Sequence, residues 1–282
     1  MDPEFAVPAS LDEAVRCLEH EGAVAVGGGT QVGLLLRQGL IDPSRLVWLE
    51  RVAGLREIRS DVDGSLLIGS GATLSEIAGS PVVRSAHPMV ARAAAHVGNP
   101  RVRAVGTLGG HLVHADPRQD LPPCLLVLAA EVRLLGRKGT RDVPLRDFYR
   151  GPFETAVQDG ELLIRVKIPA SPEPTRCCYL RFTPGTSNDY PTVGVAALAE
   201  FDAGATRRAA VGLGCVAPRP LLVDLPQLAG RPLDATALAA AGQAAATACD
   251  PASDQRGSAG YKRAMVRLWT ERALRACRPL DG

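Results

Sequence analysis

The chain lacks the features that mark several large classes of protein. Its 282 residues contain no apolar run long enough to cross a membrane and no recognisable signal peptide. The formal net charge is only +2, so the composition gives no electrostatic reason to expect nucleic acid or an anionic membrane as a partner. With 46% hydrophobic and 22% charged residues, the composition is that of a globular protein long enough for more than one domain.

The cysteine pattern excludes a second group of proteins. The seven cysteines form no C-x-x-C motif, and only Cys177 and Cys178 are adjacent. An odd number without such spacing argues against a disulfide framework and against a zinc or iron–sulfur site, so we expect no bound metal and a reducing, cytoplasmic location. No G-x-S-x-G motif occurs, so a serine nucleophile with its histidine and acid partners is not supported.

The common phosphate-binding fingerprints are also missing. No glycine-rich stretch is followed by the Gly-Lys-Ser/Thr of a Walker loop. The only near match to G-x-G-x-x-G is GLGCVA at residues 212–217, and it is followed by Pro-Arg-Pro instead of a helix. We interpret that match as a coincidence.

What the chain does contain is an unusual segment at residues 98–123, GNPRVRAVGTLGGHLVHADPRQDLPP. It shows almost no helical or strand periodicity, yet apolar residues flank it closely on both sides, which favours an ordered binding loop over disorder. The paired glycines Gly109 and Gly110 let main-chain N–H groups approach a ligand without obstruction by a Cβ atom. Ligands that use bare N–H groups are anions, above all phosphates.

A second glycine cluster strengthens this interpretation. Residues 23–26 predict a short buried strand, residues 27–29 are all glycine, and residues 31–37 predict a helix. A strand, a glycine turn and a helix N-terminus together favour a bound diphosphate, because the helix dipole and the free N–H groups both attract negative charge. One such loop alone is more often a tight turn, but two of different design indicate a dinucleotide held by its diphosphate.

The order of predicted elements indicates an α+β protein in three parts. We expect a first α/β subdomain at residues 6–54 and a second at residues 55–170, the latter with one long helix from about residue 82 to 96. Residues 169–174, PASPEP, are the best linker. A C-terminal domain at residues 175–280 should contain a three-stranded antiparallel sheet with a layer of alanine-rich helices. Its strands are expected at residues 177–183, 193–201 and 207–216, and its helices at 234–249 and 259–276.

These segments as a set resemble the FAD-binding subunit of molybdenum hydroxylases, a family that includes the medium subunit of carbon monoxide dehydrogenase and the flavin domain of xanthine dehydrogenase. The resemblance is carried by residues 27–31, 98–100, 106–110, 114–123, 143–148, 189–193 and 258–263. It implies that the first two subdomains form the FAD-binding domain. It also implies an electron-transfer flavoprotein with iron–sulfur and molybdopterin subunits as partners, and NAD or another molecule as electron acceptor.

The resemblance further implies a set of cofactor contacts. These are Val26, Gly27, Gly28, Gly29, Thr30, Gln31, Val97, Thr107, Gly109, Gly110, His111, Asp120 and Arg181. Asp120 matches an aspartate that accepts hydrogen bonds from a ribose hydroxyl pair, although an N-cap of the following helix is an alternative. Arg181 matches a cation near the flavin, where it stabilises the reduced form, although an edge-strand arginine facing water is nearly as good an interpretation.

Two residues are candidates for a role in catalysis. Tyr190, in the segment Asn188-Asp189-Tyr190, matches a loop that lies over the isoalloxazine ring in relatives, or else it packs at a domain interface. His111 departs from the family, which has asparagine, aspartate or serine after Gly-Gly. It can donate to a phosphate or titrate near the cofactor, or it is a neutral hydrogen-bonded residue. The alternatives for the whole chain are a stand-alone FAD-dependent oxidase or dehydrogenase of a small metabolite, and a non-enzymatic protein with a flavin site.

Overall fold

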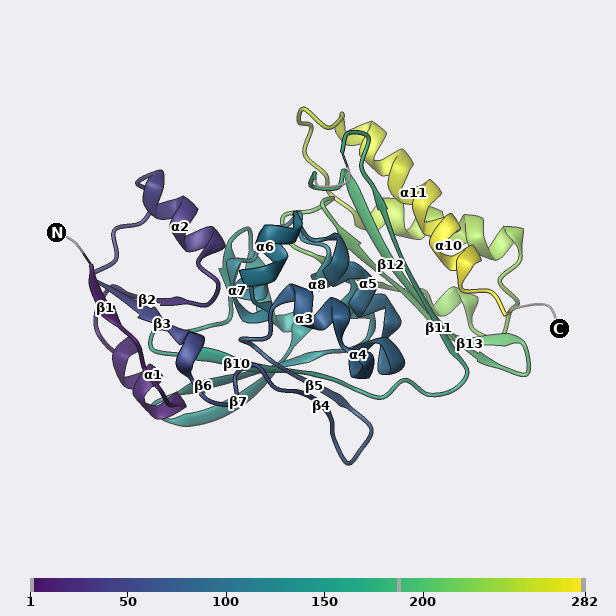
Figure 1. Ribbon diagram of the computed structural model, residues 1–282. Coiled ribbons are helices and arrows are strands. Elements are labelled where there is room, and N and C mark those ends of the chain that lie inside the picture. Colours follow the sequence, from purple (N-terminus) through teal and green to yellow (C-terminus); the bar gives the residue numbers. More distant parts are fainter. Residues whose placement is uncertain (1–2, 187–188, 280–282) are drawn as a thin grey trace.

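The computed structural model describes residues 3–186 and 189–279, which form three parts in chain order (Figure 1). The first part is a parallel sheet of three strands in the order β1-β3-β2, with two helices. Its elements are β1 (Glu4–Ala6), α1 (Leu11–Leu18), β2 (Ala23–Val26), α2 (Thr30–Arg37) and β3 (Arg45–Trp48). The strand, glycine turn and helix predicted at residues 23–37 are confirmed. A short 3-10 helix (Leu49–Arg51) leads into the second part.

The second part is an antiparallel sheet of five strands in the order β4-β5-β10-β6-β7. Its strands are β4 (Ile58–Ser60), β5 (Leu66–Gly69), β6 (Glu131–Gly136), β7 (Gly139–Pro144) and β10 (Leu162–Ile168), with the small pair β8 (Tyr149–Gly151) and β9 (Glu154–Thr155) nearby. This unit was expected to be α/β, but its strands run antiparallel, because hairpins and not crossover helices connect β4 to β5 and β6 to β7.

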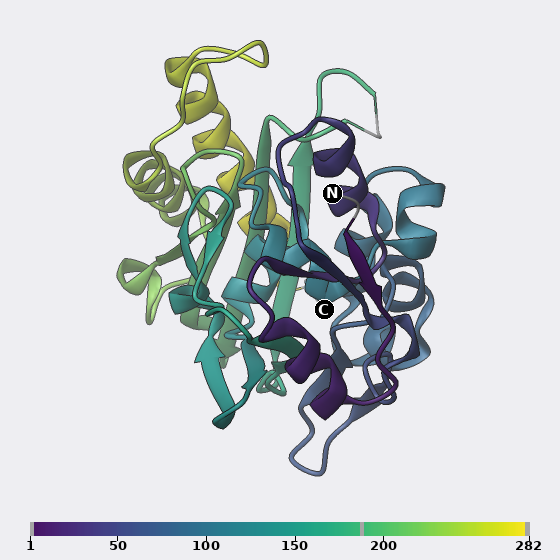
Figure 2. The same ribbon diagram turned by 90° about the vertical axis from the view of Figure 1, so that its left-hand side faces the viewer.

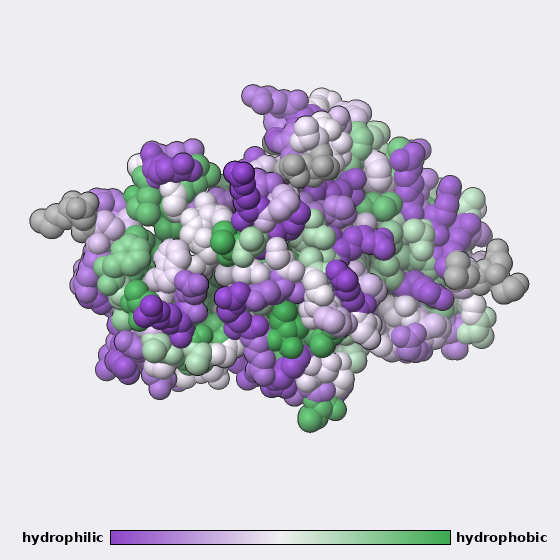
Figure 3. Space-filling model, in the orientation of Figure 1, coloured by the Kyte–Doolittle hydropathy of each residue, from purple (hydrophilic) through white to green (hydrophobic). Residues whose placement is uncertain are grey.

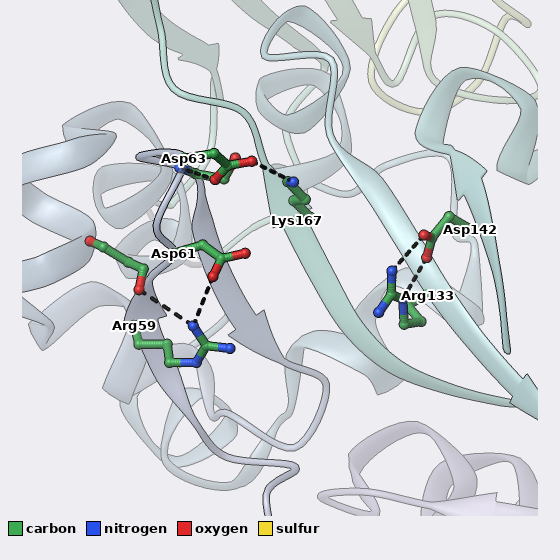
Figure 4. A network of polar contacts seen from close by, with 8 residues as sticks. Arg59, Asp61, Asp63, Arg133, Asp142 and Lys167 are labelled. Carbon is green, nitrogen blue, oxygen red and sulfur yellow. Dashed lines mark hydrogen bonds and ion pairs between the residues drawn. The ribbon is translucent and has the colours of Figure 1, made fainter.

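Helices cover one face of this second sheet. They are α3 (Leu74–Gly79), α4 (Pro81–Ala86), α5 (Pro88–His96), α6 (Pro100–Val105), α7 (Leu108–His114), α8 (Leu121–Val127) and α9 (Leu145–Phe148). Along β6, Val132 and Leu134 are buried, whereas Arg133 between them is partly exposed. Strand side chains alternate between the two faces, so the other face carries ion pairs, including the bidentate pair of Arg133 with Asp142 (Figure 4). Such exposed pairs contribute at most about 1 kcal/mol each.

The third part is a four-stranded antiparallel sheet backed by two long helices. Its elements are β11 (Thr175–Phe182), β12 (Val193–Asp202), β13 (Ala205–Gly214), β14 (Leu221–Asp224), a 3-10 helix (Pro226–Leu228), α10 (Ala235–Ala248) and α11 (Ala259–Ala276). The prediction of three strands was wrong, because β14 follows Pro218 and Pro220 directly and is only four residues long. The antiparallel sheet and its helical layer are as expected.

The central strand β12 joins two hydrophobic cores. Ala196 and Leu198 belong to the core of the second part, whereas Val195 and Ala197 belong to the core under α10 and α11. Figure 2 shows the resulting layers, with α11 on one side of the long strands and the helices of the second part on the other. The face in Figure 3 is mostly hydrophilic, with apolar residues scattered in small groups.

Two further predictions about helices were wrong. The helix expected from residue 82 to 96 is two helices, α4 and α5, that meet at His87, whose backbone is not helical (φ −142°, ψ 74°). Pro88 explains the break, since a residue before proline avoids the helical region. The segment 98–123 was expected to be an irregular loop as far as the helix after Asp120, but it folds into α6 and α7 before α8 begins. Helices of six or seven residues are too short to show a clear period, and side-chain caps from Asn99 and Thr107 start α6 and α7.

Candidate flavin site

A cavity of about 760 Å³ lies where the first and second parts meet, and the segment before β12 borders it. Most of the residues that the sequence singled out line this cavity. They are Gly27, Gly28, Gly29, Thr30, Gln31, Val97, Thr107, Gly109, Gly110, His111, Asp120 and Tyr190. Its volume falls within the range of small-molecule and cofactor sites. Two predicted contacts, Val26 and Arg181, are not in its wall.

The glycine turn after β2 supplies unpaired backbone donors to the cavity. Gly29 has a left-handed backbone (φ 68°) and stands at the N-cap of α2 without a capping side chain. The amide groups of residues 28–31 donate to no acceptor within the part of the chain that the structure describes. Because the helix dipole points its positive end at the same place, this turn can bind an anionic group. Val26, the last residue of β2, is buried and lies outside the cavity wall.

The glycines also let the two cavity-lining segments touch. A Cβ atom on Gly27 would collide with the Thr107 hydroxyl, and one on Gly28 would collide with the Val105 carbonyl. The turn of the first part therefore lies directly against the end of α6 and the start of α7. This contact brings the two glycine-rich segments to one site, as the sequence predicted.

Gly109 and Gly110 do not offer bare amide groups, in contrast to the prediction. The Gly109 amide donates to the Ser70 carbonyl at 2.7 Å, and the Gly110 amide donates to the Thr107 hydroxyl at 3.2 Å. Both residues lie in the first turn of α7, and both amides already donate to protein acceptors there. Gly109 instead permits close packing on Ser70, while the Cα of Gly110 faces space where an added Cβ would approach only the Thr107 hydroxyl, at 3.1 Å.

Asp120 is a buried carboxylate in the cavity wall. It accepts a 2.6 Å hydrogen bond from the Tyr179 hydroxyl, and its Oδ1 lies 3.6 Å from Nε of Arg181. Burial raises the pKa of Asp120 against the opposing charge of Arg181. Although Asp120 immediately precedes α8, its side chain caps no amide of that helix, so the N-cap alternative is wrong for the side chain. Asp120 is thus held by the Tyr179 hydroxyl while it also lines the cavity.

Arg181 lies behind this wall. Its guanidinium donates to the backbone carbonyls of His96 and Asp189, and its side chain is only 9% exposed. The alternative of an edge-strand arginine facing water is therefore wrong. Arg181 joins three separate segments at the border of the site, and its Nε lies 3.6 Å from Oδ1 of Asp120, which lines the cavity.

Arg118 is a cation that lines the cavity and that the sequence did not indicate. Its guanidinium forms two hydrogen bonds with the buried Asp116 and lies under the Tyr190 ring, with Cζ 4.4 Å from the ring centroid. Asp116 also accepts from the Arg118 amide at 2.9 Å, so it closes a turn across Pro117 in addition to forming the ion pair. The sequence Asp116-Pro117-Arg118 carries a signal for this turn, because aspartate and proline favour turns and the arginine lies within reach of the aspartate.

His111 also lines the cavity, but its Nε2 atom is buried without a hydrogen-bond partner among the described residues. Burial and the neighbouring His114 lower the pKa of His111 to about 4, although Asp116 opposes this. The imidazole is therefore neutral near pH 7. His114 is half-buried and packs against Phe153, with ring centroids 5.2 Å apart.

Two other sequence signals have a structural explanation or lie outside the described residues. The glycines of residues 212–217 serve packing, because a Cβ on Gly212 would collide with the Pro123 backbone of α8. Asn188, expected beside Tyr190, lies outside the described residues. Across residues 3–186 and 189–279, no group of three or more His, Cys, Asp or Glu side chains is arranged to hold a metal ion. None of the helices in those ranges has the length and apolar character needed to span a membrane.

Comparison with known proteins places these features in one family. Residues 2–171 match the family model described as the FAD binding domain in molybdopterin dehydrogenase, and residues 179–277 match the CO dehydrogenase flavoprotein C-terminal domain. The chain is 31% identical over 277 residues to the carbon monoxide dehydrogenase medium chain of Hydrogenophaga pseudoflava, covering 97% of this chain and 96% of the relative. It is 30% identical over 282 residues to the 6-hydroxypseudooxynicotine dehydrogenase complex subunit alpha of Paenarthrobacter nicotinovorans, covering 96% and 93%.

The fold agrees with this assignment. A chain in the structure of carbon monoxide dehydrogenase from Hydrogenophaga pseudoflava superposes on this one with a TM-score of 0.93 at 31% identity, covering 98% of both chains. The agreement spans both the cavity-forming parts and the C-terminal sheet. The chain therefore belongs to the family of FAD-binding medium subunits of molybdenum hydroxylases.

Proposed function

We propose that this chain is the electron-transfer subunit of a molybdenum hydroxylase, that it takes electrons from an iron–sulfur partner, and that it passes them to NAD or another acceptor. The observation that supports this most directly is the row of unpaired amides at residues 28–31, at the edge of a cavity large enough for a cofactor. When bound, FAD supplies the two-electron redox chemistry, and the protein contributes binding, orientation and electrostatics.

Different residues of the cavity hold different parts of FAD. The amides of residues 28–31 receive the diphosphate, and each hydrogen bond to a charged group contributes about 1.5–3 kcal/mol. The Thr107 hydroxyl accepts from the Gly110 amide, which leaves its own proton for a phosphate or ribityl oxygen. Asp120, already anchored by Tyr179, accepts from sugar hydroxyls. Tyr190 covers the isoalloxazine ring at the border of the site.

The partners are proposed from the relatives. Names such as medium chain and complex subunit alpha denote proteins that work with other chains. We propose one partner with iron–sulfur clusters and one with molybdopterin, where the substrate is hydroxylated. All seven cysteines are free thiols, which supports the expected reducing, cytoplasmic setting.

A stand-alone flavoenzyme needs a group that acts on its substrate, and His111 is the candidate for that role. Its Nε2 is buried, so a ligand in the cavity does not reach that atom. The structure therefore gives this alternative no specific support.

An anaerobic screen tests the proposal. The isolated, FAD-loaded chain is mixed with small metabolites and the flavin absorbance is followed. An electron-transfer subunit has no substrate site, so no metabolite should bleach the flavin, whereas a chemical reductant should bleach it and a dye should then be reduced. Rapid bleaching by a metabolite that is lost in His111→Asn, with FAD still bound, would contradict the proposal and favour a self-sufficient flavoenzyme.

A further inference from the structure

Arg118 is held in one position by groups that leave part of it free for a ligand. Its Nε donates to Oδ1 of Asp116 at 2.9 Å, and its Nη2 donates to Oδ2 at 2.8 Å. A guanidinium has five N–H groups, so this pair leaves three of them, including both on Nη1. No other side-chain hydrogen bond of Arg118 occurs within the described residues.

The Asp116 carboxylate lies behind the arginine. The Asp116 side chain is 3% exposed, whereas the Arg118 side chain is 42% exposed and lines the cavity. Burial alone would raise the pKa of Asp116, but the hydrogen bonds and charge of Arg118 hold it below its ordinary value, so the pair stays ionised near pH 7. The pair is thus a dipole with its positive end toward the cavity.

Tyr190 restricts the guanidinium from another side. The ring centroid lies 4.4 Å from Cζ, a distance at which a cation and an aromatic ring attract. The segment that carries Tyr190 is itself fixed, because Arg256 contacts the Asp189 carboxylate at 3.3 Å and Arg181 donates to the Asp189 carbonyl. A cation that is already immobilised loses little freedom when charge develops beside it.

Arg118 and Arg56 are the only arginines or lysines among the described residues of the cavity wall, and their settings differ. Arg56 follows Leu55 in the chain and pairs at 2.7 Å with Glu76, which is 41% exposed. Arg118 lies beside Tyr190 in the cavity wall, and Tyr190 is the residue that we propose covers the isoalloxazine ring. The two histidines next to the Asp116–Arg118 pair, His111 and His114, have lowered pKa values and are neutral near pH 7.

We propose that Arg118, positioned by Asp116 and Tyr190, is the residue that stabilises the negative charge of two-electron-reduced FAD in this protein, and so raises the redox potential of the bound flavin. The inference rests on the proposed function for the placement of the flavin end of the cofactor. The electrons come from the partner subunit or from a chemical reductant, and one proton accompanies the pair, which leaves the reduced flavin with one negative charge.

The test compares the affinities of oxidised and reduced FAD in matched variants. In Arg118→Gln, reduced FAD should lose about tenfold more affinity than oxidised FAD, since a half-exposed charge acts through a screened medium. By linkage, that ratio corresponds to a midpoint potential lower by about 30 mV for a two-electron couple. Arg118→Lys keeps the charge and should stay near the wild-type ratio.

Two further variants keep the test decisive. The double variant Asp116→Asn with Arg118→Gln leaves no buried carboxylate unpaired, and it should lower the potential in the same direction. Arg263→Gln removes an exposed cation of α11 outside the cavity wall and should leave the ratio unchanged. An unchanged ratio in both Arg118→Gln and the double variant, or an equal shift in Arg263→Gln, overturns the inference. Failure of the wild-type chain to bind FAD at all would instead overturn the proposed function.

Discussion

Replacing Gly110 by valine should strongly weaken FAD binding while leaving the protein folded. A Cβ at this position meets only the Thr107 hydroxyl, at 3.1 Å, and the rest of the side chain would extend into the cavity. Valine is no worse than glycine in a helix, so the free energy of unfolding of the apo-protein should change by less than about 0.5 kcal/mol. If the intruding side chain displaces two charge-assisted hydrogen bonds of the diphosphate, the loss is about 3 kcal/mol, or roughly a hundredfold in Kd.

The adjacent Gly109 provides the matched control. A Cβ there would lie 2.7 Å from Cβ of Ser70 and 3.1 Å from its carbonyl oxygen, inside the protein and not in the cavity. Gly109→Ala should therefore destabilise the apo-protein by about 1–3 kcal/mol through overpacking. Chemical denaturation without FAD measures stability, and a fluorescence titration with FAD measures affinity. Wild-type affinity in Gly110→Val, or wild-type stability in Gly109→Ala, would refute this assignment of the two glycines.

Three other predictions follow from buried groups. The pKa of His111 is about 4 in the folded protein, whereas an ordinary histidine has a pKa near 6.5. Between these two values the unfolded chain binds a proton that the folded chain does not, so the free energy of unfolding should fall as the pH drops from about 6.5 to about 4. His111→Phe should flatten this part of the curve of stability against pH. Lys262→Met should lower the free energy of unfolding by about 1–3 kcal/mol, because the buried Nζ donates to the Ala252 carbonyl and to Asp254, both at 2.8 Å. Arg263→Met breaks an exposed pair of 3.5 Å and should lower it by less than about 0.5 kcal/mol in the same denaturation experiment. Tyr179→Phe should weaken FAD binding in a titration, because Asp120 loses its 2.6 Å donor, and unchanged affinity would show that this anchor is dispensable.

The sequence predicted the features that depend on neighbouring residues. The strand, glycine turn and helix at residues 23–37 are local, since a buried apolar run, three glycines and a helix start lie within 15 residues. The pairing of the two glycine-rich segments was also predicted, because both patterns suit one diphosphate. The layered C-terminal domain followed from its long strands and alanine-rich helices in the same way.

The errors concern features set by tertiary contacts. Nothing near Gly109 in the sequence shows that its amide donates to Ser70, which lies almost 40 residues earlier. Arg181 and Arg118 are both arginines near aspartates, and only the fold shows that Arg181 is buried outside the cavity wall while Arg118 lines the cavity. Likewise, the glycines of residues 212–217 are explained by the close approach of Pro123 from another part of the chain.

The most direct test of the account is the comparison of FAD with FMN as ligands of the apo-chain. FMN carries the same flavin but lacks the diphosphate bridge and the adenosine, so it cannot use the amides of residues 28–31 in the same way. We expect one non-covalently bound FAD per chain, released intact by acid, and an FMN affinity at least about a hundredfold weaker. Equal affinities for FMN and FAD, or flavin that stays attached to the chain in acid, would contradict the account.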